Sequence, residues 1–355
     1  MSRKFPYGVA TGNLVKEIFQ YAREKVFAIP AVNVIGSNTM NAVMETASYV
    51  NSPVIIQLSN GGATFNAGKG LNNQDEKAAI KGSIASAKHI HELAELYKTT
   101  VILHTDHCPK KNLLWIDGLL KANEDHYKFY GKTLFSSHML DLSQESLEEN
   151  ISICEKYFER MNKRKMTIEI ELGVTGGEED GVDHSNIDKK KLYTHPKEVS
   201  YAYERLLRIS ENFIIAASFG NVHGVYKPGN VVLRPLILKE TQEYIQKKFH
   251  TKEKPIFLVF HGGSGSSKKE IQESINYGVI KMNIDTDLQY YFTCGVRDYM
   301  SKYIKYLDKQ VGNPRGENLP NKKYYDPRVW LREGEKSFKI YLKKYFELMN
   351  NINTL

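Results

Sequence analysis

Polar side chains that could bind a metal or move a proton stand at the ends of several short apolar runs. The segment VILHTDHCPK (101–110) shows this pattern clearly, because three aliphatic residues lead into His104, Asp106 and His107. Other runs end in or lead into further polar residues: Asn33, Ser59, His138 with Asp141, Glu171, His223, His261, and Asn283 with Asp285. Imidazole nitrogens and carboxylate oxygens serve as metal ligands and as acid–base groups. If the ends of these runs meet in space, the sequence predicts a metal-assisted active site.

Three of these histidines suit a catalytic metal. His107, His223 and His261 follow different apolar runs, and three imidazoles with an open fourth position can form a catalytic zinc site. Spacing leaves the choice open, because the ligands do not share one helix. By strand alternation His104 points with Asp106 and is the better candidate for a structural core histidine. Chemistry alone leaves three more candidates: His89, His91 and His138.

Glycine-rich turns near these residues suit the binding of phosphate. FHGGSGSS (260–267) follows one run and MNIDTD (282–287) follows the next, and small residues let backbone N–H groups approach phosphate oxygens. SNGGA (59–63) offers a second anion pocket. Two such pockets beside a metal would fit a substrate that is phosphorylated at both ends. The sequence contains neither a G-x-S-x-G nucleophile elbow nor a P-loop lysine motif.

The segment TGGEEDGVDH (175–184) places Glu178, Glu179 and Asp180 among glycines and is expected to form an acidic loop. Its carboxylate spacing does not match that of a calcium-binding EF-hand loop. One interpretation is a solvated surface loop. The other is that a glutamate of the loop reaches a metal-bound carbonyl substrate and acts as general base.

The elements that must position these residues alternate along the chain. Eight apolar, β-branched runs separated by helix-like segments are expected to be strands: 27–34, 53–59, 100–106, 134–140, 166–172, 212–218, 255–260 and 278–285. Strands that alternate with helices predict an α/β fold with a parallel sheet. Eight such units within about 290 residues fit a closed (β/α)8 TIM barrel better than an open doubly wound sheet. Active sites of TIM barrels lie at the carboxyl ends of the strands, where these polar residues fall.

The remaining residues are expected to form a helical extension, so that the catalytic barrel spans 1–290 and the extension spans 291–355. In EKSFKIYLKKYFELMNNI (335–352), six apolar side chains share one helical face: Phe338, Tyr341, Leu342, Tyr345, Phe346 and Met349. We expect this face to pack on the barrel or on a neighbouring subunit.

Composition favours an intracellular protein. The chain has 355 residues, 41% of them hydrophobic, and three cysteines that form neither a C-x-x-C zinc pair nor an even disulfide set. We expect a cytoplasmic protein that is neither exported nor membrane-spanning, because the sequence has no signal-like segment and no run of about 18 apolar residues. The net charge of +8 suits small phosphorylated substrates. We expect no nucleic-acid partner, because the lysine runs lack interleaved aromatic residues.

Over essentially its whole length the chain resembles the class II fructose-1,6-bisphosphate aldolases of the longer class IIA type. The motifs that carry the resemblance are PAVNV, QLSNGGATFNAGKG, ILHTDHCPKK, LFSSHMLDLS, IEIELGVTGGEEDGVD, AASFGNVHGVYKPGNV, FHGGSGS, KMNIDTD and NKKYYDPRVW. This resemblance implies reversible, zinc-dependent aldol cleavage of fructose 1,6-bisphosphate, and a homodimer whose active site receives Arg328 from the partner subunit.

The resemblance also implies roles for single residues. It places the zinc ligands at His107, His223 and His261, and it makes Asp106 the acid/base, Glu179 the loop base and Asn283 the contact to the enediolate. A second, non-catalytic divalent metal position falls on Asp141 and Glu171. The phosphate contacts carry over to Gly224, Gly262, Ser264, Asp285 and Thr286 on one side, and to Ser59 and Arg328 on the other. We add Asn33 and Lys227 to the substrate-binding residues. Activation by a monovalent cation, K⁺ or Na⁺, is expected near Val222, Gly224 and Gly262.

Other functions remain to be weighed. A metal-dependent hydrolase on the same barrel would use the same histidines, but it would not explain two anion pockets. A non-catalytic nucleic-acid-binding protein would use the positive charge, but it would leave the polar strand ends unexplained. Tagatose 1,6-bisphosphate is the nearest competing substrate, because it differs from the fructose compound only at C4.

Overall fold

The computed structural model describes residues 1–355 except 1–3, 180–181, 184–191, 224–232 and 264–265; for 176–179, 182–183 and 222–223 it describes the backbone only. The strands of the main sheet are β1 (Gly8–Ala10), β2 (Ile29–Asn33), β3 (Val54–Leu58), β4 (Thr100–Cys108), β5 (Ser137–Leu140), β6 (Thr167–Leu172), β9 (Phe213–Ala217), β11 (Leu258–Phe260) and β12 (Val279–Ile284). Short strands outside this sheet are β7 (Gly176–Glu179), β8 (Val182–Asp183), β10 (Val222–His223), β13 (Val311–Asn313) and β14 (Gly316–Pro320).

The helices are α1 (Asn13–Lys25), α2 (Ser37–Tyr49), α3 (Asn60–Ala67), α4 (Lys77–Leu93), α5 (Leu113–Tyr130), α6 (Leu147–Asn162), α7 (Pro196–Leu207), α8 (Leu236–Phe249), α9 (Lys268–Asn276), α10 (Thr286–Leu307), α11 (Lys322–Tyr325) and α12 (Pro327–Leu348). Two single 3₁₀ turns, Gln74–Glu76 and Lys110–Asn112, precede α4 and α5.

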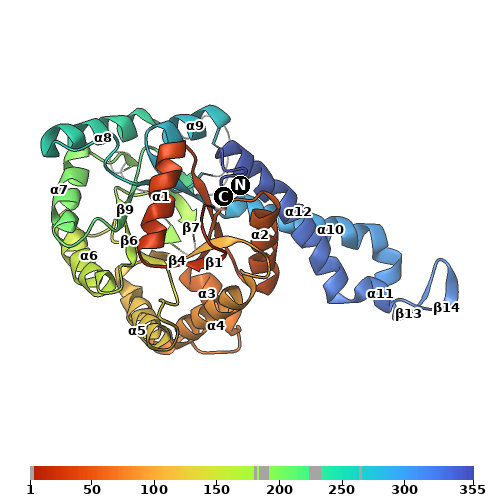
Figure 1. The fold of residues 1–355 in the computed structure, drawn as a ribbon. Coiled ribbons are helices and arrows are strands. Elements are labelled where there is room, and N and C mark those ends of the chain that lie inside the picture. The colour runs from red at the N-terminus through yellow and green to blue at the C-terminus, as the bar shows by residue number, and fades with distance from the viewer. Residues whose placement is uncertain (1–3, 180–181, 184–191, 224–232, 264–265) are drawn as a thin grey trace.

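Parallel strands close into a barrel that is surrounded by helices (Figure 1). Within the described residues the order around the barrel is β2–β3–β4–β5–β6–β9–β11–β12, and β12 pairs with β2 to close the circle. The predicted TIM barrel is thus confirmed. Seven strands lie inside their expected ranges, and β4 runs on to Cys108. The sequence did not predict β1, a three-residue strand that pairs with the start of β4.

The barrel interior changes from apolar to polar along the strands. Ile102 of β4 lies in an apolar cluster with Val15 and Phe19 of α1, so this helix packs against the amino ends of the strands. Two and four residues further along the same face, His104 and Asp106 make polar contacts with other strands. The polar half of the interior therefore lies at the carboxyl ends, where the sequence placed the site.

The outer helices cover the barrel through a second, larger apolar cluster between strands and helices. Local signals set where several of these helices begin. The hydroxyl of Ser59 accepts the N–H of Gly62 at the start of α3, and Ser267 forms a capping box with Glu270 at the start of α9. Within the described residues, no helix combines the length and apolarity that crossing a bilayer requires.

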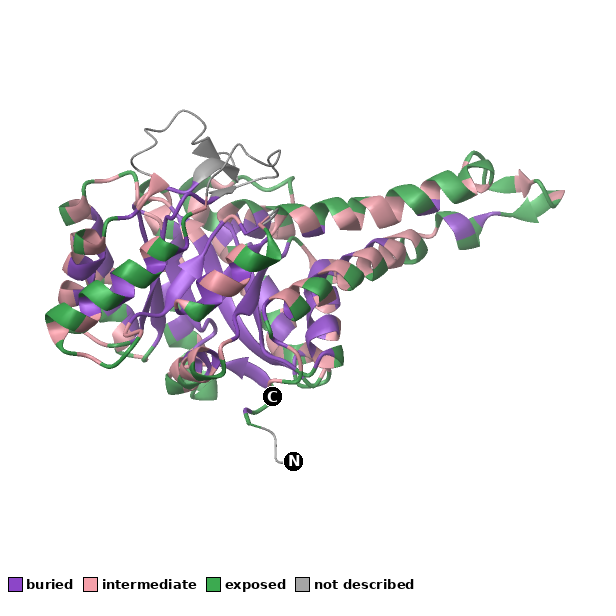
Figure 2. Cartoon of the chain, turned by 90° about the horizontal axis from the view of Figure 1, so that it is seen from above, coloured by how far each residue is buried: buried purple, intermediate pink, exposed green. Residues whose placement is uncertain are grey.

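The C-terminal helices form an arm that extends away from the barrel (Figure 2). Helix α10 runs outward, the β13–β14 hairpin and α11 lie near the tip, and α12 returns to pack against α2 and α10. On α12, Phe338, Leu342 and Phe346 are buried in the main core. The boundary that we proposed at residue 290 falls inside α10, which begins at Thr286.

Candidate active site

Asp106 and His107 are neighbours in β4, yet both side chains reach the same group of potential ligands. In a regular strand, adjacent side chains point to opposite faces. Strand β4 departs from this rule because its register with β5 shifts between Thr105 and Cys108, and His107 has a φ of 41°. A positive φ is uncommon for residues other than glycine, and a local bulge re-aims side chains. The irregularity explains how consecutive residues serve one site.

The Asp106 carboxylate is held by three side-chain amides. Asn33 Nδ2 and Gln57 Nε2 donate to its Oδ2 at 3.0 and 2.8 Å, and Asn283 Nδ2 donates to Oδ1 at 3.1 Å. The same Gln57 nitrogen also lies 2.7 Å from Asn33 Oδ1. These residues come from β2, β3, β4 and β12, so the strand ends meet as the sequence predicted.

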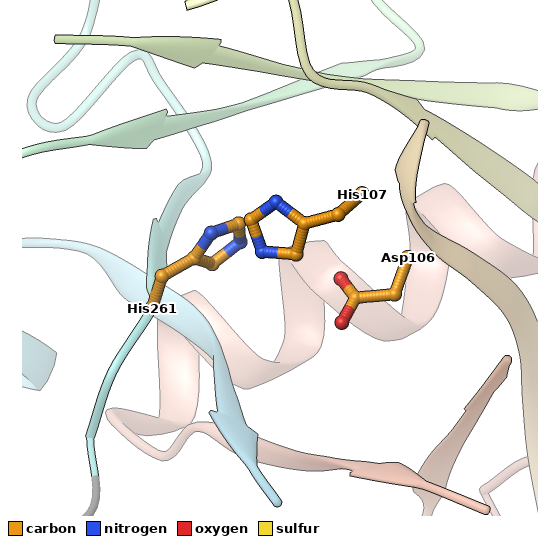
Figure 3. Close-up of side chains that lie close together, drawn as sticks. All are labelled: Asp106, His107 and His261. Carbon is orange, nitrogen blue, oxygen red and sulfur yellow. The ribbon is translucent and has the colours of Figure 1, made fainter. Parts of the chain in front are cut away.

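Two overlapping sets of potential metal ligands meet at His107 within the described residues. One set is Asp106, His107 and His261, and the other is His107, Asp141 and Glu171; the ligand atoms of each set lie within 4.8 Å of one another. Figure 3 shows the two imidazole rings close together with Asp106 beside them. Their ring centroids are 4.7 Å apart. Imidazole and carboxylate donors suit a divalent cation such as zinc.

His261 lies between two buried glutamates. Its Nε2 is 2.8 Å from Glu169 Oε1, and its Nδ1 is 3.4 Å from Glu171 Oε2. Burial alone would lower the pKa of His261, but the two carboxylates outweigh it and raise the pKa to about 9 in the protein without an ion. Since a metal-ligating histidine commonly donates its other ring N–H to a carboxylate, Glu169 leaves Nδ1 as the nitrogen that a metal would take.

The carboxylates of the second set are also fixed by hydrogen bonds. His107 Nδ1 lies 2.9 Å from Asp141 Oδ2, and the Ser143 hydroxyl donates to Asp141 Oδ1 at 2.7 Å. Although burial opposes it, these contacts hold the pKa of Asp141 well below its usual range. Thr175 donates to Glu171 Oε1 from both its backbone N–H and its hydroxyl, at 3.2 and 2.9 Å. Asp141 and Glu171 thus face His107 as acceptors.

A buried charged layer lies beside these groups in the barrel interior. Lys281 Nζ is 3.1 Å from Glu169 Oε1 and 2.7 Å from Asn283 Oδ1, and His104 Nε2 is 3.2 Å from Glu169 Oε2. The side chains of Lys281, Glu169 and His104 are at most 1% exposed. Burial would raise the pKa of Glu169, but Lys281 and His104 hold it well below its usual range.

Sequence reasoning missed Gln57, Glu169 and Lys281. Each stands on a largely apolar strand, two residues before a polar residue that the sequence had singled out: Gln57 before Ser59, Glu169 before Glu171, and Lys281 before Asn283. That alternation was the signal that could have found them.

The other candidate histidines have partners outside the two ligand sets. His104 is a buried core residue, as expected, and its Nδ1 contacts the Ser137 hydroxyl at 2.7 Å. His138 lies between Thr105 and Asn123, and burial lowers its pKa to about 3. His89 and His91 contact Asn41 Oδ1 and Leu134 O, at 2.8 and 2.9 Å. None of these four belongs to either of the two ligand sets.

The expected phosphate residues are described in part. Ser59 caps α3, Asp285 is the N-cap residue of α10 and Thr286 its first residue, and Gly262 follows β11 with a φ of 60°. These positions are at the carboxyl ends of β3, β12 and β11. Three predicted contacts lie outside the described residues: Gly224, Lys227 and Ser264. The backbones of Glu179, Val222 and His223 lie in β7 and β10, but their side chains are outside the described part.

Arg328 lies at the start of α12 and not among the strand ends of its own chain. Its guanidinium forms a two-point contact with Asp326, with Nε 3.0 Å from Oδ1 and one terminal nitrogen 2.6 Å from Oδ2. The side chain is 86% exposed. The arginine is therefore oriented by a neighbouring carboxylate and remains open to solvent.

Comparison with known proteins identifies the family. A sequence model of class-II fructose-bisphosphate aldolase matches residues 13–354. The chain is 58% identical to fructose-bisphosphate aldolase class 2 of Escherichia coli (strain K12), with 100% of both chains covered. It superposes on a crystal structure of fructose-bisphosphate aldolase from Campylobacter jejuni with a TM-score of 0.90 and 56% identity, covering 99% of this chain and 98% of the other. The YdjI aldolase of Escherichia coli K12 shares the fold at 20% identity, with a TM-score of 0.65 and coverage of 97% and 98%. Histidine and carboxylate side chains are thus gathered at the carboxyl ends of a (β/α)8 TIM barrel. The chain belongs to the class-II fructose-bisphosphate aldolase family.

Proposed function

We propose that the protein cleaves fructose 1,6-bisphosphate to dihydroxyacetone phosphate and glyceraldehyde 3-phosphate, and catalyses the reverse condensation, in glycolysis and gluconeogenesis. Family membership over residues 13–354 supports this reaction. The observation that carries it is the meeting of Asp106, His107 and His261, from two different strand ends, within ligand distance of one another. These side chains suit a metal ion, which when bound would stabilise a carbanion beside a ketone.

Zinc is the proposed catalytic metal, held by His107, His223 and His261. Zn²⁺ when bound supplies a Lewis acid that polarises the substrate carbonyl. Asp141 and Glu171, which face His107, are proposed to hold a second divalent ion. A monovalent cation, K⁺ or Na⁺, is proposed to activate the enzyme near Val222, Gly224 and Gly262.

The proton transfers are assigned to two carboxylates. Glu179 removes a proton from C1 of dihydroxyacetone phosphate, and Asn283 donates its amide N–H to the enediolate oxygen that results. Asp106 takes the C4 hydroxyl proton during cleavage and returns a proton to the aldehyde oxygen during condensation. The amides of Asn33, Gln57 and Asn283 support this role, because they fix the carboxylate of Asp106 in one orientation.

The two phosphates are assigned to opposite sides of the site, and the bound substrate also contacts Asn33 and Lys227. One phosphate is bound by Gly224, Gly262, Ser264, Asp285 and Thr286. The other is bound by Ser59 and by Arg328 of a second copy of the chain. The homodimer follows from the second assignment, since Arg328 stands at the start of α12 and its side chain is exposed to solvent in its own subunit. We infer that the extension, assigned to 291–355, contributes to the dimer interface and that the enzyme is cytoplasmic.

The direct test is a side-by-side cleavage assay with fructose 1,6-bisphosphate and tagatose 1,6-bisphosphate, which differ only at C4. We expect the fructose compound to have the higher kcat/KM. A preference for the tagatose compound, or release of inorganic phosphate instead of two triose phosphates, would contradict the proposed function.

A further inference from the structure

Lys281 is a fully buried lysine inside the barrel, and none of the proposed roles uses it. Its side chain is 1% exposed, and its Nζ lies 3.1 and 3.0 Å from the two carboxylate oxygens of Glu169 and 2.7 Å from Oδ1 of Asn283. An ammonium group has three N–H donors and no acceptor. All three donors of Lys281 therefore have acceptors, and one of these is the side-chain oxygen of a residue in the reaction path.

The contact with Lys281 determines which side of the Asn283 amide faces the substrate. Because the ammonium group can only donate, it must face the amide oxygen of Asn283. The amide nitrogen is then directed to the opposite side, where it donates to Asp106 Oδ1 at 3.1 Å. Without Lys281, the buried Asn283 oxygen would lose its hydrogen-bond donor, which favours rotation of the side chain.

The lysine is badly placed to act as a nucleophile. Schiff-base chemistry requires a free amine that can approach a carbonyl carbon. All three donors of Nζ are engaged by acceptors, and the Glu169 carboxylate lies between this group and His261, in contact with both. Burying an ion pair also carries a desolvation cost that well-packed apolar side chains would avoid. A positioning role accounts for the pair at this place.

We propose that Lys281 is a positioning residue of the aldolase reaction, which fixes the Asn283 amide so that its N–H₂ group faces Asp106 and the enediolate. This inference rests on the proposed function. Lys281 does not touch substrate in this account, and its effect on catalysis passes through Asn283. Glu169 balances the charge of Lys281 and separately orients His261.

A double-mutant cycle tests this route. Lys281→Met should lower kcat by about 10- to 100-fold, because the buried Asn283 oxygen is left without its donor, with little change in KM. Asn283→Ala should lower kcat by about 100- to 1000-fold, as for the loss of a preorganised donor. If Lys281 acts through Asn283, the double variant should match Asn283→Ala within about twofold. If the kcat losses of the two single variants multiply in the double variant, the proposal is overturned. An unchanged kcat in Lys281→Met would overturn it as well.

Zinc affinity supplies a readout that does not depend on turnover. A competing chelator should show that Lys281→Met binds zinc as tightly as the unmodified protein, within about twofold. Zinc binding that weakens as much as kcat falls would mean that the lysine acts on the metal ligands instead, and would overturn the assignment to Asn283.

Two controls distinguish a loss of folding from a loss of catalysis. Gln242→Met removes buried hydrogen bonds to the backbone of Ile256, far from the strand carboxyl ends, and should lower stability while leaving kcat per folded enzyme unchanged. If Lys281→Met does not fold because Glu169 is left unpaired, the same cycle is run in a Glu169→Gln background, where that charge is absent, with zinc in excess because this background is itself expected to bind zinc more weakly. Failure of the unmodified enzyme to cleave fructose 1,6-bisphosphate would refute the proposed function. An active enzyme in which the kcat losses of the two single variants multiply would refute only the role of Lys281.

Discussion

Nε2 of His261 lies 2.8 Å from Oε1 of Glu169, and both side chains are almost completely buried. This pairing fixes the orientation of the imidazole and leaves its other nitrogen for a metal. Glu169→Gln should therefore weaken zinc binding by about 10- to 100-fold, the range typical for carboxylates that support a metal-ligating histidine. Chelator competition on folded protein provides the measurement. Unchanged zinc affinity in Glu169→Gln would show that the carboxylate is not needed to orient His261.

The two proposed catalytic carboxylates should be separable. Glu179→Gln should lose exchange of the C1 proton of dihydroxyacetone phosphate with solvent, because Glu179 is the group assigned to that proton. Asp106→Asn should lose cleavage while retaining more of the exchange, because Asp106 acts on an oxygen across the breaking bond. Proton exchange followed by NMR, together with a cleavage assay, checks the difference. Equal losses of both activities in the two variants would refute this division.

Docking of α12 on the barrel should depend on pH through Glu45 of α2. Arg332 makes two contacts of 2.8 Å with this carboxylate, and Lys339 adds a third. The bond from Arg332 outweighs burial and lowers the pKa of Glu45 from 4.5 to about 2. Because the folded pKa lies below the unfolded one, the stabilisation is fully present above pH 4.5 and is lost as the pH falls through about 2.

Glu45→Gln should accordingly lower the free energy of unfolding at pH 7 by about 1 kcal/mol or less, since the group is partly solvated. The difference from the unmodified protein should shrink between pH 4.5 and 2. Urea denaturation at a fixed protein concentration across this range measures it. A difference that stays constant with pH would show that Glu45 acts through packing and not through its charge.

Arg328 should act on the phosphate that it is proposed to bind in the partner subunit. Arg328→Ala should weaken the use of fructose 1,6-bisphosphate by about 1.5 to 3 kcal/mol, the range for a charged hydrogen bond, and should affect fructose 1-phosphate far less. Mixing this variant with inactive His107→Ala should restore some bisphosphate cleavage, because one hybrid site would have an intact metal site and an intact arginine. Equal losses on both substrates without rescue would leave Arg328 a structural residue.

The sequence predicted the barrel well because its strands are buried on both faces and therefore appear as continuous apolar runs. It also predicted that Asp106, His107 and His261 would meet, since barrel strands bring their carboxyl ends together. Ordinary alternation could not explain how Asp106 and His107 share a site, because the bulge that turns His107 has no clear signature in the sequence.

The charged interior was harder to predict. Glu169 and Lys281 are far apart in the chain, and their ion pair exists only because β6 and β12 both face the barrel interior. A lone lysine in an apolar strand gives no indication of its partner. The shape of the arm was also missed, since the amphipathic pattern of α12 predicts a buried face but not the outward course of α10.

Metal dependence is the central claim, and chelation followed by zinc addition tests it most directly. Removal of metal should abolish cleavage of fructose 1,6-bisphosphate, and added zinc should restore it. Borohydride added with substrate should trap no covalent adduct, because the account uses a metal and no Schiff base. Cleavage that persists in the metal-free protein, with a substrate fragment trapped on a lysine such as Lys281, would contradict the account.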